Sequence, residues 1–384
     1  MTSPAAPAAS TPSICFVGIN NLPALAPEFA HLGIGGAELQ QTILAKSLAR
    51  RGYRVSMVVA DLGQPEGESW FGVRTHKAYA PRAGMPVLRF FHPRWTGLVG
   101  AVHRSGAWLR YCSCAGLAVG QVALYARSHP GRLVFRVASD SDCQPDKLLI
   151  PNWRGKVLYA YGLRRADLVL AQSAQQQALL ERNYQRSSMT VPSLVDLEPR
   201  LVARAERDID ALWVGNLRRV KRPDVALELA RAAQSLVLHI IGGPQPGEEA
   251  YSIEIAQSAA AIANIRFHGL QPYARVNDVM ARAVVHVNTS DIEGFPNTYL
   301  QAWARGTPVV AFFDPDGVVA RRKLGLIVRD VAEMRDAVAR LHADSGLWHE
   351  ISANCRRYVN DVHGDAAVDR YTAALEALDV GGAR

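Results

Sequence analysis

Strand-like and helix-like patterns alternate along most of the chain, and this alternation restricts the fold more than any other feature of the sequence. From residue 211 onward, short runs rich in valine, isoleucine and leucine are each followed by a segment with helical periodicity. This order predicts parallel sheets covered by helices. The predicted strands are 211–215, 236–242, 265–269, 284–288 and 308–312, and the predicted helices are 223–234, 251–263, 274–283 and 298–305.

The first half of the chain alternates in the same way. The predicted strands there are 14–18, 53–59, 132–138 and 168–171, and the predicted helices are 37–50 and 173–183. We therefore predict an α/β protein with two doubly wound, Rossmann-like domains that face a central cleft. The predicted domains are 1–200 and 201–362, with a linker at 198–210, and a C-terminal helix in 363–384 that packs back on the first domain.

The composition agrees with this architecture and locates the charge. The chain has 384 residues with 49% hydrophobic side chains, which suffices for two cores and excludes a disordered or collagen-like protein. The net charge is +8, but residues 69–139, which we name the basic segment, contain ten lysines and arginines and no acidic residue. The other residues hold 33 basic and 35 acidic side chains, so the positive charge belongs to the basic segment.

The cysteines and the N-terminal residues indicate the cellular compartment of the protein. The five cysteines show neither a disulfide framework nor zinc-binding spacing, which indicates a reduced, cytoplasmic protein. Residues 1–12 lack the charged and apolar regions of a signal peptide, and we expect a flexible tail. The uncharged stretch 111–126 is shorter than the roughly 20 apolar residues of a membrane-spanning helix, so we predict a buried helix there.

The stretch 290–306, SDIEGFPNTYLQAWARG, carries the strongest local signal. It follows a predicted strand, turns at Gly294 and begins a helix near Pro296 and Asn297. The free amides at a helix start favour a phosphate group. The carboxylate of Glu293 would repel phosphate, so it suits neutral partners such as sugar hydroxyls. A plain carboxylate at a helix start is an equally open alternative.

Two other strand-to-helix turns carry groups that suit an anion. The stretch 214–224, VGNLRRVKRPD, brings Lys221 close to a helix start, where a lysine neutralises phosphate oxygens, together with Arg218, Arg219 and Arg222. Each arginine alone is accounted for equally well as solvated charge. Gly35 and Gly36 precede the predicted helix 37–50 and leave room for an anion at the backbone. The spacing is not that of dinucleotide-binding proteins, because Glu38 occupies the third glycine position.

Taken together, these three segments resemble the retaining glycosyltransferases of family 4, which have the two-domain GT-B fold. The resemblance covers most of the chain. The family's GG-x-E turn corresponds to Gly35, Gly36 and Glu38, and its G-R-L-x-x-x-K turn corresponds to Gly215, Leu217 and Lys221. The family's E-x7-E motif before a G-x-P-V-V strand corresponds to Glu293, followed by Gly306, Pro308, Val309 and Val310.

The resemblance implies a hexosyltransferase that takes a UDP- or GDP-linked sugar as co-substrate and needs no metal or other cofactor. Lys221 would hold the donor diphosphate, Glu293 the donor sugar hydroxyls, and Gly35, Gly36 and Glu38 would face the diphosphate or the acceptor from the other domain. The leaving phosphate would help to deprotonate the acceptor, with retention. The other implied donor-binding residues are Asn216, Arg222, Gly242, Gly243, Gly294, Phe295, Pro296, Asn297, Thr298 and Gln301.

The sequence departs from the family pattern at three places. Asn216 stands where the family has a phosphate-binding arginine, so Lys221 would carry more of the charge. Gln301 replaces the second glutamate, which meets the nucleotide ribose, and an amide can still bond a hydroxyl. Many relatives carry a histidine near the position of Ala138, and we expect Asp140 to take its place as a catalytic polar contact.

The acceptor implied by the resemblance is a glycan or a polyprenyl-diphosphate-linked glycan, in surface polysaccharide or glycoconjugate biosynthesis. The basic segment mixes arginines with aromatic residues, which suits an anionic membrane surface. A solvated face above core aromatics is the alternative. We expect a cytoplasmic protein that is peripheral on the inner face of the cell membrane. The aromatic residues are Trp70, Phe71, Phe90, Phe91, Trp95 and Trp108.

Other protein classes remain open from the residues. A sugar-nucleotide epimerase would share the two-domain architecture. A nucleic-acid binder would account for the basic segment but not for the glycine turns or Glu293, so we expect no nucleic-acid partner. An NAD-dependent enzyme lacks the third glycine. A metal-dependent glycosyltransferase of the other large fold would use an Asp-x-Asp pair, and three pairs have this spacing: Asp140/Asp142, Asp208/Asp210 and Asp314/Asp316.

Overall fold

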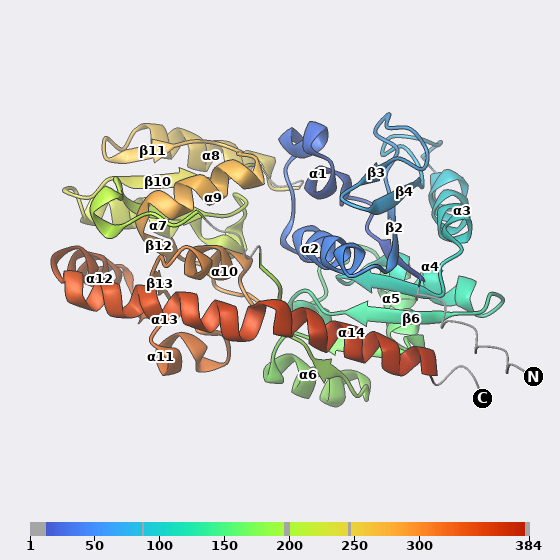
Figure 1. Cartoon of the computed structure of the whole chain (residues 1–384). Helices are drawn as coiled ribbons and strands as arrows, with labels where there is room; N and C mark the ends of the chain where they lie inside the picture. Colours follow the sequence, from blue (N-terminus) through green and yellow to red (C-terminus); the bar gives the residue numbers. More distant parts are fainter. Residues whose placement is uncertain (1–12, 87, 196–199, 245–246, 381–384) are drawn as a thin grey trace, which may run out of the picture.

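The structure is a computed structural model that describes residues 13–86, 88–195, 200–244 and 247–380. It consists of two lobes that lie side by side (Figure 1). The expected flexible tail at 1–12 and residues 198–199 of the expected linker lie outside the described residues. The described linker residues contain one short 3-10 helix, Arg204–Glu206.

The N-terminal lobe is built on an eight-stranded sheet in the order β3-β4-β2-β1-β5-β6-β7-β8. The strand pairs are parallel apart from β3–β4. Helices α3 (Thr96–Ser105), α4 (Leu117–Ala126) and α5 (Trp153–Arg165) supply the core on one face, and α2 (Gly36–Arg50) supplies it on the other. The strands are β1 (Ser13–Val17), β2 (Arg54–Val59), β3 (Ser69–Trp70), β4 (Val73–Lys77), β5 (Leu109–Ser113), β6 (Arg132–Arg136), β7 (Leu168–Ala171) and β8 (Met189–Thr190).

The C-terminal lobe is built on a six-stranded parallel sheet in the order β11-β10-β9-β12-β13-β14. One continuous apolar core joins this sheet to its helices. The strands are β9 (Ile209–Val214), β10 (Leu238–Ile241), β11 (Ile265–Phe267), β12 (Ala283–Asn288), β13 (Val309–Ala311) and β14 (Gly325–Ile327). The helices are α7 (Pro223–Ala232), α8 (Glu249–Ala260), α9 (Tyr273–Arg282), α10 (Asn297–Ala304), α11 (Val318–Arg322) and α12 (Val331–Ala343).

Two consecutive helices connect the lobes at the C-terminus. Helices α13 (Ser345–His363) and α14 (Asp365–Val380) form an almost continuous rod that runs from the C-terminal lobe across the N-terminal lobe (Figure 1). The buried guanidinium of Arg136, on β6, donates to the hydroxyl of Tyr371 on α14 at 2.9 Å and to that of Ser193 at 2.8 Å. The bond to Tyr371 connects α14 to the N-terminal lobe.

The order of the strands determines where a ligand can bind. The sequence order of the strands reverses between β9 and β12 in the C-terminal lobe, and between β1 and β5 in the N-terminal lobe. At such a point the connections leave toward opposite faces of the sheet and open a crevice at the carboxyl ends of the strands. The stretches 214–224 and 290–306 follow β9 and β12.

The predicted α/β architecture with two doubly wound parallel sheets is confirmed. The buried helix predicted over 111–126 is confirmed for its second part, where α4 covers Leu117–Ala126, and is wrong for residues 111–113, which belong to β5. A central strand buried on both faces is as apolar as a buried helix. The absence of charged residues therefore could not distinguish a strand from a helix in this stretch. The prediction also missed β4, α3 and α5. No described helix is long and apolar enough to span the membrane.

Candidate functional site

Two adjacent loops of the C-terminal lobe are hydrogen-bonded to each other. The loop after β9 carries Lys221, and the loop after β12 carries Glu293. The hydroxyl of Thr289 lies 2.9 Å from the carbonyl oxygen of Lys221, and it accepts a hydrogen bond from the indole of Trp213. The amide of Asp291 donates to the carbonyl of Val220 at 3.0 Å. The sequence separates these loops by about seventy residues, and the β9–β12 pairing brings them together.

Lys221 and Glu293 are in direct contact at this place. The ammonium of Lys221 donates to Oε1 of Glu293 at 2.6 Å. The Glu293 side chain is 10% exposed and that of Lys221 is 26% exposed, so both are largely buried and keep some contact with solvent. A cation and a carboxylate side by side at a half-buried position offer one partner for a phosphate and one for neutral hydroxyls.

The N-terminal lobe approaches the Glu293 loop closely. A Cβ atom at Gly294 would lie 3.1 Å from both the carbonyl oxygen of Ala138 and Nε2 of Gln176. Gln176 also donates to Asp140 at 2.9 Å. Burial raises the pKa of Asp140, and the negative charges of Asp316 and Glu293 act in the same direction. The structure thus places Asp140 on the wall opposite Glu293.

A second contact between the lobes shows why paired glycines occur at the start of α2. The side-chain amide of Asn297, at the start of α10, donates to the carbonyl of Gly36 at 2.9 Å. A Cβ at Gly36 would lie 2.6 Å from that nitrogen, and a Cβ at Gly35 would lie 2.2 Å from a carboxylate oxygen of Glu38. The absence of side chains at Gly35 and Gly36 therefore makes room for protein groups. Burial raises the pKa of Glu38.

The sequence reasoning missed Gln40, which completes this contact. Its amide nitrogen donates to Asn297 at 2.8 Å and to the carbonyl of Leu194 at 2.7 Å, and its amide oxygen accepts from the Leu194 backbone. Gln40 is buried, and it links α2, α10 and the end of the N-terminal lobe. A glutamine inside a buried helical stretch was the available signal, because its amide requires partners.

Other predicted donor-binding residues have local partners in the C-terminal lobe. Arg222 has a left-handed backbone conformation and forms ion pairs with Asp224 and Asp291. Gln301 is buried and donates to Asn277 at 2.9 Å. A Cβ at Gly242 would lie 2.3 Å from the carbonyl oxygen of Gly215, so this glycine lets the loops after β9 and β10 pack together.

Further predicted residues lie beside the Lys221–Glu293 pair along the chain. The ring of Phe295 packs against Trp303 and His363, with centroid distances of 6.2 and 5.2 Å. Pro296 is buried and precedes α10, and Thr298 lies in its first turn. The backbone of Gly243 accepts from the amide of Leu217 at 2.9 Å. Asn216 lies between β9 and Lys221.

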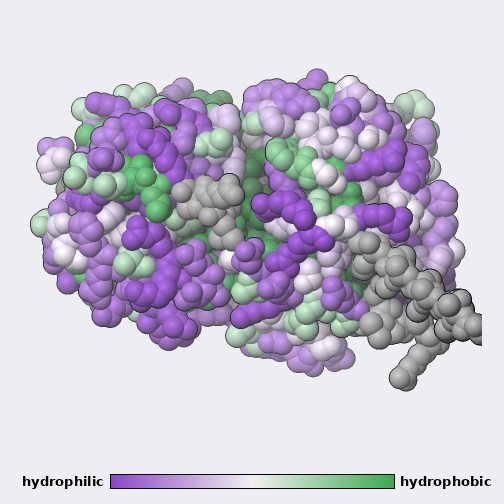
Figure 2. Space-filling view, viewed as in Figure 1, coloured by the Kyte–Doolittle hydropathy of each residue, from purple (hydrophilic) through white to green (hydrophobic). Residues whose placement is uncertain are grey.

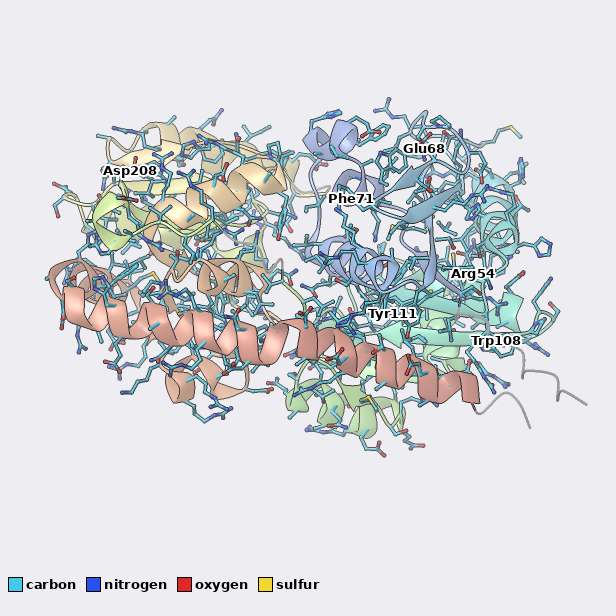
Figure 3. The ribbon with its side chains drawn as sticks, viewed as in Figure 1. Arg54, Glu68, Phe71, Trp108, Tyr111 and Asp208 are labelled. Carbon is cyan, nitrogen blue, oxygen red and sulfur yellow. The ribbon has the colours of Figure 1, made fainter. Side chains whose placement is uncertain are left out.

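The three Asp-x-Asp pairs have protein partners. Asp208 forms an ion pair with Arg282, and Figure 3 shows it at the outer end of the C-terminal lobe, on the far side from the other lobe. Asp142 accepts backbone amides of Ala138 and Ser139, and burial raises its pKa to about 6. The other partners are Gln176 for Asp140, Val237 for Asp210, Val319 for Asp314 and Ala174 for Asp316.

The structure divides the cations of the basic segment into two groups. Five of them form ion pairs or hydrogen bonds with other groups of the protein: Lys77, Arg104, Arg110, Arg132 and Arg136. The acids that pair with three of these, Asp61, Glu66 and Asp167, flank the segment in the sequence. Figure 3 places Trp108 at the outer end of this lobe, away from the cleft. Only part of the basic segment is therefore available to a partner.

A groove separates the two lobes, and hydrophobic residues are visible in its depth (Figure 2). Residues 208–344, which include Lys221 and Glu293, match the profile of the family Glycosyl transferases group 1. No curated protein matches the chain. The predicted GT-B fold is confirmed by solved structures that match nearly the whole chain.

Three of these structures show how far the similarity extends. Sucrose-phosphate synthase from Thermosynechococcus elongatus has a TM-score of 0.78 and 20% identity, over 96% of this chain and 100% of that chain. HepE from Anabaena, in complex with UDP and glucose, has a TM-score of 0.72 and 15% identity, over 95% and 99%. WaaG, a glycosyltransferase involved in lipopolysaccharide biosynthesis, has a TM-score of 0.66 and 15% identity, over 93% and 98%.

Proposed function

We propose that this chain is a retaining glycosyltransferase of family 4. It transfers a hexose from a UDP- or GDP-linked sugar to a glycan or polyprenyl-diphosphate-linked acceptor, in the synthesis of a surface polysaccharide or glycoconjugate. The observation that carries the proposal is the contact between Lys221 and Glu293 at the strand-order reversal of the C-terminal lobe. Asp140 and Gly36 of the other lobe face the same loop region.

The chemistry follows from the charges at this place. When the bond between the sugar and the phosphate breaks, its electron pair goes to the leaving diphosphate, and the sugar becomes oxocarbenium-like. The ammonium of Lys221 and the start of α10 stabilise the developing negative charge. The carboxylate of Glu293 accepts hydrogen bonds from the sugar hydroxyls. The leaving diphosphate takes the proton of the acceptor hydroxyl on the same face, which gives retention.

We also propose that the reaction needs no metal ion or other cofactor. In metal-dependent transfer a divalent cation neutralises the leaving diphosphate. Here Lys221 and the positive end of the α10 dipole supply that charge. Asn216, in place of an arginine, leaves Lys221 as the main cation among the residues that the family pattern assigns to the diphosphate.

Exposed residues of the basic segment support the proposal of a membrane-linked acceptor. Met85, Leu88 and Phe91 are exposed in the basic segment, next to the exposed Arg82 and Arg89. We name these five residues the apolar-basic patch. Exposed apolar side chains beside arginines suit the interface of an anionic bilayer. A peripheral position on the inner face of the cell membrane would bring a lipid-linked acceptor to the cleft.

The test of the proposed function is hexose transfer by purified variants, measured as release of UDP or GDP. The donor is chosen first by thermal stabilisation of the wild type, since a ligand at 100 times its dissociation constant adds about 2.7 kcal/mol. Lys221→Ala and Glu293→Ala remove one partner of the site each. We expect each to reduce kcat by about 100-fold or more, because each group acts on the transition state.

The matched control is Lys323→Ala and Glu350→Ala, which break an exposed lysine–glutamate pair with a distance of 3.0 Å on the outer surface. These variants should keep wild-type turnover, and all four should keep the wild-type circular dichroism. Turnover should persist in EDTA. Near-normal turnover of Lys221→Ala or Glu293→Ala would refute their roles, and strict metal dependence would refute the metal-free mechanism.

A further inference from the structure

An open cavity of about 620 Å³ lies where the two lobes meet the junction of α13 and α14. In Figure 1, α6 (Ala174–Tyr184) and α11 flank this junction on either side. The volume falls within the range of about 300–1,000 Å³ that is usual for small-molecule sites. The lining residues from the N-terminal lobe are Gln172, Thr190 and Pro192, and those from the C-terminal lobe include Phe295, Pro315 and Val318.

Three arginines from two different elements line this cavity. Arg321 and Arg322 are on α11, and Arg370 is on α14. All three are exposed, and in the part of the chain that the structure describes none of them forms an ion pair or a side-chain hydrogen bond. The lining contains a single carboxylate, Asp316, which accepts the amide of Ala174 at the start of α6. The cavity therefore carries an excess of two positive charges.

Apart from Gln172 and Thr190, the remaining wall of the cavity is apolar and aromatic. Tyr358, Val362 and His363 line it from α13, and the rings of Tyr358 and Phe295 each lie 5.2 Å from that of His363. Burial lowers the pKa of His363 to about 4, so its ring is neutral and adds no charge. Guanidinium groups bind phosphate oxygens in a bidentate manner, and aromatic walls accept a flat or nonpolar body.

We propose that this cavity is a binding site for a soluble phosphate monoester with a nonpolar ring. The phosphate lies among Arg321, Arg322 and Arg370, and the ring lies against Phe295 and Tyr358. This site is separate from the Lys221–Glu293 pair, which does not line the cavity, and it does not depend on the proposed transferase activity.

The position of the site gives a bound ligand two effects. Arg370 belongs to the helix fastened to the N-terminal lobe, whereas Arg321 and Arg322 belong to the C-terminal lobe, so the phosphate bridges the lobes. Phe295 is two residues from Glu293, so the ligand also touches the loop of the candidate active site. A regulator of lobe closure would act at such a place.

The test uses phenyl phosphate as the probe and isothermal titration calorimetry as the measurement. We expect millimolar or tighter binding to the wild-type chain, and weaker binding of inorganic phosphate and of phenol. Arg370→Gln and the double variant Arg321→Gln/Arg322→Gln should each weaken binding by about tenfold or more, because each removes charge-assisted hydrogen bonds. Arg335→Gln, an exposed arginine paired with Asp336, is the matched control and should bind as the wild type does.

Lys221→Ala separates this site from the candidate active site. It should bind phenyl phosphate as tightly as the wild type, even if it abolishes transfer. The substituted arginines are exposed, and unchanged melting temperatures will show that the variants are folded. The proposal is overturned if the wild type does not bind phenyl phosphate at millimolar concentration, if the arginine variants bind it undiminished, or if Lys221→Ala abolishes binding.

Discussion

Single buried polar residues set the conditions under which the site is stable. His286, on β12 below the Glu293 loop, is fully buried and donates through Nδ1 to the carbonyl of Leu212 at 3.0 Å. Burial lowers its pKa from 6.5 to about 4, although the nearby Glu293 charge opposes this shift. The folded protein therefore keeps a neutral imidazole where the unfolded chain would bind a proton.

The stability of the protein should fall in mild acid for this reason. Between pH 6.5 and about 4 the unfolded chain binds a proton at His286 and the folded protein does not, so the free energy of unfolding decreases as the pH falls. His286→Asn should reduce the difference in unfolding free energy between about pH 7.5 and about pH 5 by about 2 kcal/mol. Urea denaturation at both pH values measures this difference.

The exposed His31 supplies the control for this measurement. His31→Asn should leave the difference between the two pH values as in the wild type. An unchanged difference in His286→Asn would show that burial of this imidazole does not account for the acid sensitivity. A variant that is less stable by the same amount at both pH values shows only a loss of packing. Protonation of the imidazole is measured by the difference in unfolding free energy between the two pH values.

At the scale of elements, the rod of α13 and α14 holds the N-terminal lobe through α14. Arg136 is 2% exposed, and among the described residues its hydrogen bond to α14 is the one to the hydroxyl of Tyr371. Tyr111, labelled in Figure 3, is buried in the same apolar cluster as Tyr371 of α14. At the outer edge of α14 the hydroxyl of Tyr53 donates to Glu376, and the guanidinium of Arg51 donates to Asp369. The buried bond matters most, because water cannot replace it.

Tyr371→Phe should therefore destabilise the protein by about 1–3 kcal/mol, because it leaves the guanidinium of Arg136 buried without this acceptor. The midpoint of urea unfolding checks this value. Tyr184→Phe is the matched control, since the Tyr184 hydroxyl is buried and has no hydrogen-bond partner among the described residues. The control should lose less than about 0.5 kcal/mol. Equal losses in both variants would show that the Arg136 bond contributes nothing.

At the scale of the whole molecule, the fold redistributes the charge of the sequence. About half of the cations in the basic segment form ion pairs or donate to a backbone carbonyl or to buried hydroxyls. The apolar-basic patch keeps exposed arginines beside Met85, Leu88 and Phe91. Arg82 and Arg89 thus remain available to a partner beside three exposed apolar side chains.

Co-sedimentation with vesicles tests the role of this patch. We expect the wild type to bind vesicles that contain phosphatidylglycerol and to be released by high salt, because each arginine near an anionic surface contributes about 1 kcal/mol. Arg82→Gln/Arg89→Gln and Phe91→Ser should each move most of the protein to the supernatant. Ile253→Ser removes an exposed apolar side chain of the C-terminal lobe and should leave binding unchanged. Binding of all variants alike would contradict a role of the patch.

Part of the candidate site was predictable because its signals are local. The turns at Lys221, Gly294 and Gly36 were visible in the sequence, since glycines and prolines mark where a strand ends and a helix begins, and the charges stand beside them in the chain. Gln40 and the bond between Asn297 and Gly36 were not predictable, because they join residues more than 150 positions apart. The pairing of Arg222 with two aspartates also depends on neighbouring loops.

The alternation of strands and helices, the two doubly wound sheets and the chemistry at the ends of β9 and β12 could be predicted from the amino-acid sequence. They follow from periodicity and from residues close in the chain. Which charges are paired and which remain for a ligand became clear from the folded arrangement. This arrangement also shows that Lys221 meets Glu293 and that three arginines from two helices line one cavity. Such contacts depend on the packing of distant segments, and local sequence patterns do not record it.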